Sequence, residues 1–364
     1  MPNDTNTRGR LIRQGQKAAA VRLQAIGNQS SEDLLAAFEA ALARIRSGLE
    51  SLTDASGTVP IQSLPAAEQL VNDALSALNQ QTRQIVDSSL SVAATLGIDP
   101  WSEVADVISG VDLRNEVLEW VQTFVDENGL QLSDRLWRVD RLAKTRVIEA
   151  IQGAVIEGRS ASQAARDLLL RGRFVPFDLE SKAGRAEIAR IQKELGDALL
   201  TGQGNPWFNA ERVMRTEINR AYGEVAVRAA AEHPDVVAVR FLLSPRHPRP
   251  DICDMHATAN LHGLGPGVYP IDNHPWPAHP NTLSYLEPIF IDEITTEDRK
   301  GRETMTNFIN GLPADRQDAI LGGKAKGWAW RAGHLDPRQV STPWYKVRAQ
   351  LQRRGIDIPQ EHAP

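Results

Sequence analysis

The chain is 364 residues long, 24% of them charged and 41% apolar, and its formal net charge is −5. These values are typical of a globular protein, and at about 150 residues per domain the length predicts two or three domains. The negative charge excludes a uniformly basic nucleic-acid-binding protein, and the single cysteine, Cys253, excludes a disulfide framework. No apolar run approaches the roughly 20 residues that span a bilayer, and the polar N-terminus lacks the apolar stretch of a secretory signal. We therefore expect a soluble protein, made in a reducing cytoplasm and without a membrane partner.

The N-terminal region, 1–135, is predicted to be helical with a basic arm. Residues 1–30 carry a charge of +4, whereas residues 31–100 carry −6. Apolar residues recur every three or four positions over 34–52, 71–86 and 113–124, the spacing of a buried helix face. We interpret 60–65 as a linker, Asp99-Pro100 as a break and Asn128-Gly129 as a helix end. The arm is either solvated or in contact with phosphates or an acidic partner.

The central region, 136–235, is predicted to be a second helical block. Two helices meet at a tight turn within 140–172, with Ser160 as the cap of the second. This pattern fits a DNA-binding helix-turn-helix, but any helical hairpin needs the same residues, and the second helix offers only Gln163 and Arg166 to read bases, which favours an ordinary hairpin. Further helices are expected near 180–200 and over 209–232, where Asn209 is the candidate cap and Pro234 the end.

The helical pattern gives way at residue 236 to β-branched residues and then to a segment rich in proline and histidine. Strands are expected at 236–243 and 285–291, and six of the eight histidines lie between His233 and His279. Cys253-x-x-His256 has the spacing with which a turn offers two ligands to Zn²⁺, and His274 and His279 can supply the other two. One structural Zn²⁺ is the only cofactor that this pattern suggests. In the competing interpretation, the histidines hydrogen-bond loop carbonyls in a proline-rich segment.

The same loop also carries residues that occur in two kinds of catalytic site. An HNH-like nuclease requires a histidine at a strand end that faces a metal-bound phosphate, and no His-His or Asp-His dipeptide marks that position. A catalytic Cys253 thiolate is disfavoured because Asp251 and Asp254 lie beside it. We therefore expect no enzyme activity, and keep a DNA-binding or HNH-like nuclease module as the alternative.

Three motifs follow one another along the chain: Arg215-Thr216-Glu217 within a predicted helix, Asp251-x-Cys253-x-x-His256 after a strand, and His279-Pro280-Asn281 in a loop. In this order they resemble the head morphogenesis (minor head protein) family of tailed phages, the Mu F-like proteins. The family shows an Arg-Thr-Glu helix, a strand, a Cys-x-x-Cys or Cys-x-x-His pair and a His-Pro-Asn-Cys loop. The segments 312–322 and 328–335 also resemble the family's C-terminal part, so that the resemblance covers about 140–335.

The chain departs from the family at one position, because the cysteine after His-Pro-Asn is Thr282 here. The ligand set that the resemblance implies has therefore lost a member, and His274, Asp251 or water can replace it; alternatively, the loop has dispensed with metal. Arg215 and Glu217 lie two residues apart and so on different helix faces, which favours the pinning of separate loops over a shared catalytic centre.

The resemblance implies a structural, low-copy component of the capsid interior at the portal vertex, assembled in the host cytoplasm. Its expected partners are the portal protein and the major capsid or scaffolding protein. Packaged DNA is the third, through phosphate contacts of the basic ends that comprise Arg8, Arg10, Arg13, Arg348, Arg353 and Arg354.

The predicted fold is mainly α with a small α+β, loop-rich module. Four regions are expected: the helical 1–135, the helical 136–235, the β-containing His/Pro-rich module 236–292 and the helical segment 293–364 with a basic tail.

Overall fold

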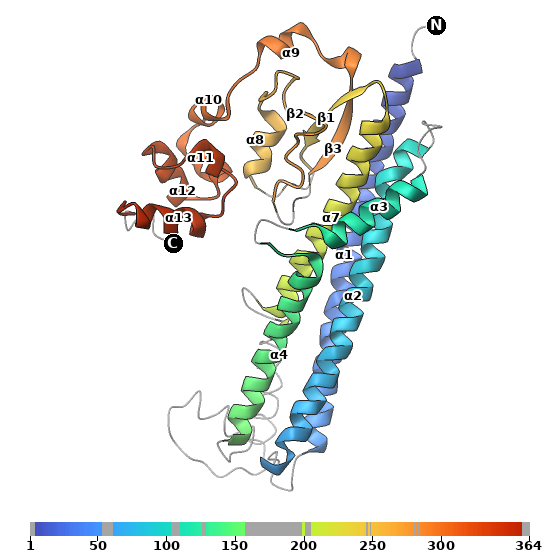
Figure 1. Cartoon of the computed structure of the whole chain (residues 1–364), viewed down its shortest axis with the longest axis vertical. Coiled ribbons are helices and arrows are strands. Elements are labelled where there is room, and N and C mark those ends of the chain that lie inside the picture. The colour runs from blue at the N-terminus through green and yellow to red at the C-terminus, as the bar shows by residue number, and fades with distance from the viewer. Residues whose placement is uncertain are drawn as a thin grey trace. The chain divides into compact units, whose positions relative to one another are not determined.

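Long helices make up most of the computed structural model (Figure 1), which describes residues 4–52, 61–102, 110–125, 129–156, 199–200, 205–244, 247, 249–279, 282 and 284–358. The long helices are α1 (Asp4–Ser51), α2 (Leu64–Ser102, after the 3-10 helix Ile61–Ser63), α3 (Gly110–Thr123), α4 (Leu132–Ile156) and α7 (Pro206–Glu232). The described chain also holds one small antiparallel sheet, which confirms the predicted mainly α fold with a small α+β module. No helix among the described residues combines the length and the apolar character needed to cross a membrane.

The first helix corrects the prediction of a basic arm. Residues 4–30 belong to α1, and Ile12, Ala19 and Leu23 on it are buried. The sequence pattern failed here because small alanines and the buried polar Gln16 fill the inward face, so that few large apolar residues mark it.

Two predicted helix boundaries were also wrong. Pro100 lies in the last turn of α2 rather than at a break. Gly15 of α1 approaches this proline so closely that a Cβ added to the glycine would lie 2.9 Å from the Cβ of Pro100. The close approach of Gly15 leaves room for the proline ring. Helix α3 ends at Thr123, before the predicted Asn128-Gly129; Gly129 has a φ of 76°, and Asn128 lies outside the described residues.

The cap of α7 is Asn205, not the predicted Asn209. The Asn205 side chain accepts a hydrogen bond from the Phe208 amide at 2.7 Å, and Pro206 occupies the first helical position, where no amide donor is needed.

We expect Asn205→Ala to lower the free energy of unfolding by about 1 kcal/mol, because an orphaned amide at the start of the helix loses its acceptor. Asn209→Ala, inside the helix, should change it by less than about 0.5 kcal/mol. Urea denaturation followed by circular dichroism measures both. Equal effects of the two substitutions would contradict the assignment of the cap.

The described contacts divide the chain into two units. The first unit comprises Met1–Gln24, Ala93–Val117 and Asn219–Pro364, and the second comprises Ala25–Val92 and Leu118–Ile218. Each unit is assembled from segments that are far apart in the sequence. The four consecutive regions expected from the sequence stay a prediction.

The regular structure among the described residues of the second unit is helical. Apolar side chains of α1 and α2 form its core; they include Leu34, Phe38, Leu42, Ile45, Val71, Leu75 and Leu78. Ser30 and Ser89 hydrogen-bond each other at 2.7 Å between the same two helices, so a polar pair fixes their register within the apolar core.

The first unit contains the sheet, whose order is β2-β1-β3 with both pairings antiparallel. The strands are β1 (Val236–Leu242), β2 (Val268–Pro270) and β3 (Tyr285–Phe290), and β1 and β3 coincide with the predicted strands to within one residue. In the register, Val239 lies opposite both Tyr269 on β2 and Pro288 on β3. The short helix α8 (Ile252–Thr258) lies between β1 and β2 in the sequence.

Short helices follow the sheet, as predicted for the C-terminal segment. They are α9 (Thr296–Lys300), α10 (Met305–Asn310), α11 (Ala314–Leu321), α12 (Lys324–Arg331) and α13 (Trp344–Arg353), with 3-10 helices at Ile291–Glu293 and Pro337–Gln339. Their apolar side chains, among them Ile309, Trp330 and Leu351, form one core with Met255 and Ala259. The C-terminal helices therefore pack against one face of α8 and its C-terminal end.

A lysine lies buried beside this C-terminal core, with carbonyl oxygens as its hydrogen-bond acceptors. The Lys326 ammonium donates hydrogen bonds to the carbonyl oxygens of Val340 and Thr342, the latter at 2.8 Å. Burial lowers the pKa of Lys326 to about 8 from 10.5, because it disfavours the charged form.

The unfolding free energy of the wild type should therefore rise, relative to that of Lys326→Met, as the pH increases from 8 to 10.5. Below pH 8 the folded state holds a proton at a cost, and above pH 10.5 neither state is protonated. After allowance for solvent screening, the change in the difference is on the order of 1–2 kcal/mol. Parallel urea titrations of both proteins at pH 7.5 and 10.5 measure it; a constant difference would contradict the lowered pKa.

Candidate metal centre

The start of α8 positions two of the predicted site residues. Asp251 is the N-cap: its Oδ1 accepts a hydrogen bond from the Cys253 amide at 2.7 Å, while Asp254 Oδ2 accepts one from the Asp251 amide at 2.8 Å. This reciprocal capping fixes the Asp251 side chain beside Cys253. The Cys253 side chain is buried, with a relative exposure of 1% for the residue.

The loop before β3 supplies the other side of the site. Asn219, on α7, donates a hydrogen bond from Nδ2 to the Thr282 carbonyl at 2.6 Å and so ties the loop to that helix. Earlier in the loop the Trp276 side chain lies against Gly223 of α7, where any side chain would collide with it. Both contacts lie on the part of α7 that follows Arg215-Thr216-Glu217.

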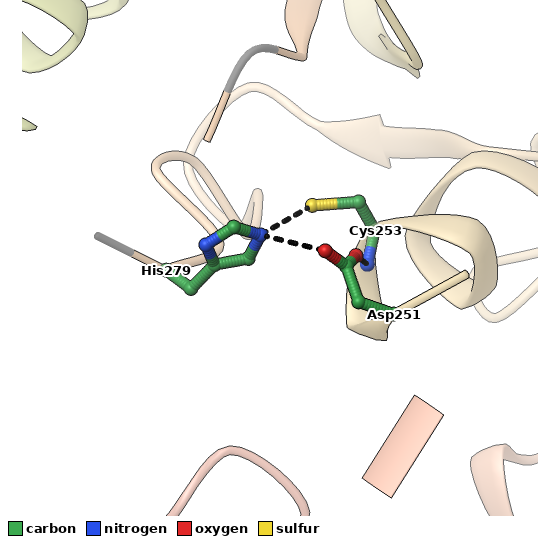
Figure 2. Close-up of side chains that lie close together, drawn as sticks. All are labelled: Asp251, Cys253 and His279. Carbon is green, nitrogen blue, oxygen red and sulfur yellow. Dashed lines mark hydrogen bonds and ion pairs between the residues drawn. The ribbon is translucent and has the colours of Figure 1, made fainter. Parts of the chain in front are cut away.

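Three potential metal ligands meet between the helix and the loop, as Figure 2 shows. His279 Nε2 lies 3.1 Å from Cys253 Sγ and 3.3 Å from Asp251 Oδ2. All three ligand atoms lie within 4.8 Å of one another. Thr282 Oγ1 lies 3.6 Å from Cys253 Sγ, so the position at which the chain departs from the resembling family lies beside the same cluster.

The geometry distinguishes metal binding from nucleophilic catalysis. In a catalytic triad the carboxylate and the nucleophile contact different nitrogens of the histidine, which lets the ring pass a proton between them. Here the thiol and the carboxylate both approach Nε2. The three ligand atoms lie within 4.8 Å of one another, which is close enough for a single ion, and the buried thiol is not presented to a substrate.

Hydrogen bonds keep the carboxylate ionised. Burial opposes ionisation of Asp251, but its hydrogen bonds with His279 and the Cys253 amide outweigh burial and lower its pKa to about 2. A carboxylate that is charged throughout the physiological range is a competent ligand for a divalent cation.

His247 forms a second group that the sequence analysis missed. Its Nε2 lies 2.9 Å from Asp254 Oδ2 and 3.9 Å from Asp251 Oδ1, so Asp251 belongs to both groups. The available signal was the spacing His247-x-x-x-Asp251-x-x-Asp254, but a search for Cys and His pairs passes over it.

Two of the four predicted zinc ligands lie outside these groups in the described part of the chain. His256 Nδ1 lies 3.1 Å from the Tyr269 hydroxyl, and burial lowers the pKa of His256 to about 4. His274 Nδ1 accepts a hydrogen bond from the Trp276 amide at 3.3 Å, and burial lowers its pKa as well. The structure thus brings Cys253 and His279 together with Asp251 and gives His256 and His274 other partners.

The Arg-Thr-Glu residues connect α7 with other helices of the second unit. Arg215 donates from Nε to Ser31 Oγ at 3.2 Å on α1, and the carboxylate of Glu217 pairs with Arg135 on α4. The Thr216 hydroxyl bonds to the Arg212 carbonyl within α7. The prediction that Arg215 and Glu217 pin different elements agrees with these contacts, although the elements are helices and not loops.

The predicted DNA-contacting residues differ in their environment. Arg10 is exposed, Arg13 pairs with Glu293 at 2.9 Å, and the three arginines 348, 353 and 354 are exposed on α13 and its C-terminal cap. The Arg8 side chain, Asn281 and the second helix of the predicted hairpin within 140–172 lie outside the described residues.

Comparison of the chain with protein-family models, with curated proteins and with solved structures gives no match in any of the three.

Proposed function

We propose that this chain is a structural minor head protein of a tailed bacteriophage, located inside the capsid at the portal vertex. The observation that carries the proposal is the convergence of segments whose order resembles the minor head proteins. The loop with His279 and Thr282 meets Cys253 on one side, and it is tied to the helix of the Arg-Thr-Glu motif by Asn219 on the other.

The contacts of these residues favour a structural role. Arg215 and Glu217 bond to different helices, and Cys253 is buried against His279. Groups arranged in this way hold segments of a fold together, and none of them presents a nucleophile on the surface. The long helices provide surfaces on which a portal and a capsid or scaffolding protein can dock.

Co-purification tests the proposal directly. The tagged chain is co-expressed with the portal protein encoded in the same phage genome, and we expect the two to elute together as a complex of fixed stoichiometry. Mass spectrometry of purified virions should find the chain at low copy number. Absence from both the portal complex and the virion would overturn the proposal. Metal-dependent nicking of supercoiled DNA that is lost in His279→Ala would favour the nuclease alternative instead.

Contact with packaged DNA makes a separate prediction. The exposed arginines 348, 353 and 354 lie at one end of the chain and can neutralise phosphates of any sequence. Replacing all three by Gln should reduce the slope of log K against log salt by up to about 3, because each lost phosphate contact changes it by about 0.9.

The matched control replaces the exposed Arg299 and Lys300 of α9 by Gln, which should leave the salt slope unchanged. Fluorescence anisotropy with a duplex of mixed sequence measures both variants over a series of salt concentrations. The same slope in the triple variant and the wild type would exclude α13 as the DNA contact.

A further inference from the structure

The atoms around His279 Nε2 already have the spacing of zinc ligands. With Zn–S near 2.3 Å and Zn–N and Zn–O near 2.1 Å, a tetrahedral ion holds its sulfur and nitrogen ligands about 3.6 Å apart, and its nitrogen and oxygen ligands about 3.4 Å apart. The corresponding distances here are 3.1 Å from Cys253 Sγ to His279 Nε2 and 3.3 Å from His279 Nε2 to Asp251 Oδ2. A shift of about half an ångström would seat the ion.

We propose that Asp251, Cys253 and His279 bind one Zn²⁺, with a water molecule as the fourth ligand. This set replaces two of the ligands that sequence spacing suggests, His256 and His274, by a carboxylate from the helix cap. The site does not depend on the proposed role in the phage head.

The donor set matches Zn²⁺ in charge and in chemical type. A thiolate and a carboxylate carry two negative charges, which balance the ion and leave the partly buried site neutral. Sulfur and imidazole nitrogen favour Zn²⁺ over Mg²⁺ and Ca²⁺, which take oxygen ligands. The Thr282 hydroxyl, 3.6 Å from Cys253 Sγ, adjoins the site and is suited to hydrogen-bond the bound water.

Hydrogen bonds around the ligands orient the carboxylate. Asp251 Oδ1 is occupied by the Cys253 amide, which leaves Oδ2 for the metal. Such outer contacts fix the direction of a ligand before the ion arrives.

The metal would join α8 to the loop that contains His279, two segments with little helix or strand between them. Between Cys253 and His279 the described regular elements are the rest of α8 and the three-residue strand β2. The same helix contributes Met255 to the core of the C-terminal helices. An ion at this point therefore connects the loop before β3 to α8 and, through α8, stabilises the base on which the C-terminal helices pack.

Metal titration of the full chain tests the site. Protein stripped with a chelator and held under a non-thiol reductant is titrated with Zn²⁺ against a competing chromophoric chelator. We expect one equivalent to bind and the melting temperature to rise. Co²⁺ in its place should give the thiolate-to-cobalt charge-transfer absorption that a Cys ligand produces. No stoichiometric Zn²⁺ binding, or Co²⁺ binding without that absorption, would overturn the proposal.

Variants identify the ligands. Asp251→Asn keeps the helix cap, since Asn caps as well as Asp, but it removes the charged ligand, and it should weaken Zn²⁺ binding at least tenfold. Cys253→Ser should abolish the cobalt absorption. His256→Gln and His274→Gln are the matched controls and should bind Zn²⁺ with unchanged stoichiometry. Loss of binding in His256→Gln together with retention in Asp251→Asn would refute the ligand set.

Thr282→Cys supplies a test in the opposite direction. A cysteine at 282 places a second sulfur beside the ion, so that four protein ligands replace three and water. We expect the dissociation constant for Zn²⁺ to fall at least tenfold and the cobalt absorption to grow. Because this variant gains binding, misfolding cannot produce the expected result. Unchanged affinity in a folded Thr282→Cys protein would count against the placement of the metal.

Discussion

Glu217→Ala is expected to lower the free energy of unfolding of the second unit by about 3–5 kcal/mol, the usual cost of breaking a buried ion pair from one side. The Glu217 side chain has a relative exposure of 0% and pairs with Arg135, whose side chain is 11% exposed. Removal of the carboxylate leaves the guanidinium in a poorly solvated place without its counter-charge. Hydrogen exchange of amides in α4 and α7, together with urea denaturation, measures the loss.

The substitution Arg215→Ala tests whether the stability cost follows the burial of the residue or its membership in the Arg-Thr-Glu motif. Arg215 pairs with Glu211 at 3.1 Å but is 28% exposed, and solvent competes for its charge. Arg215→Ala should therefore cost only about 1 kcal/mol, although both residues belong to the same motif.

The double variant Arg135→Met, Glu217→Leu tests the mechanism. Replacement of a buried ion pair by apolar side chains of similar size is often neutral or stabilising, so most of the lost stability should return. If the double variant is as unstable as Glu217→Ala, the carboxylate stabilises the unit through other contacts than the pair with Arg135.

The sequence predicted those parts of the fold in which large apolar residues recur at a regular spacing. Leu34, Phe38, Leu42 and Ile45 lie on one buried face of α1 as expected, and the β-branched run at Val236 forms β1. The first half of α1 was not predicted because alanines and Gln16 separate Ile12 and Leu23 on its inward face and carry little hydrophobic signal. Small residues permit close packing but leave almost no periodic pattern.

The candidate metal centre was predictable in its location but only in part in its membership, because Asp251 was one of three alternatives for the position of the missing cysteine. Cys253 and His279 were both named, and they meet. The pair Cys253-x-x-His256 was misleading because His256 Nδ1 has the Tyr269 hydroxyl as its partner. Asp251 belongs to the centre because it caps α8: one carboxylate oxygen binds the Cys253 amide, which directs the other to His279. Spacing rules for ligand pairs do not include this consequence of helix capping.

Gly223→Ala should destabilise the first unit and displace the loop that carries His279. An alanine Cβ at position 223 would lie 1.7 Å from Trp276 Nε1 and 2.3 Å from its Cδ1, far inside van der Waals contact. The indole is buried and packs at a tilt against Phe241, with ring centroids 6.1 Å apart, so it has little room to move. Overpacking of this kind costs about 3 kcal/mol.

Gly27→Ala is the matched control, since Gly27 also lies within a long helix but has no atom within 4 Å of an added Cβ. An alanine in a helix interior is favoured over glycine by about 0.5–1 kcal/mol, so this variant should be more stable than the wild type. The same substitution is thus expected to lower the stability at position 223 and to raise it at position 27, because only at position 223 does another side chain occupy the space of the added Cβ.

Nuclear magnetic resonance of the His279 ring and urea denaturation measure the two consequences of Gly223→Ala. Trp276 lies three residues before His279, so a displaced indole moves the loop and should separate the imidazole from Cys253 and Asp251. The ring resonances of His279 should therefore shift in Gly223→Ala and stay unchanged in Gly27→Ala. A Gly223→Ala protein of wild-type stability with an unshifted His279 would show that the tryptophan does not hold this loop in place. The close approach of Trp276 to α7 would then be incidental to the geometry of the candidate metal centre.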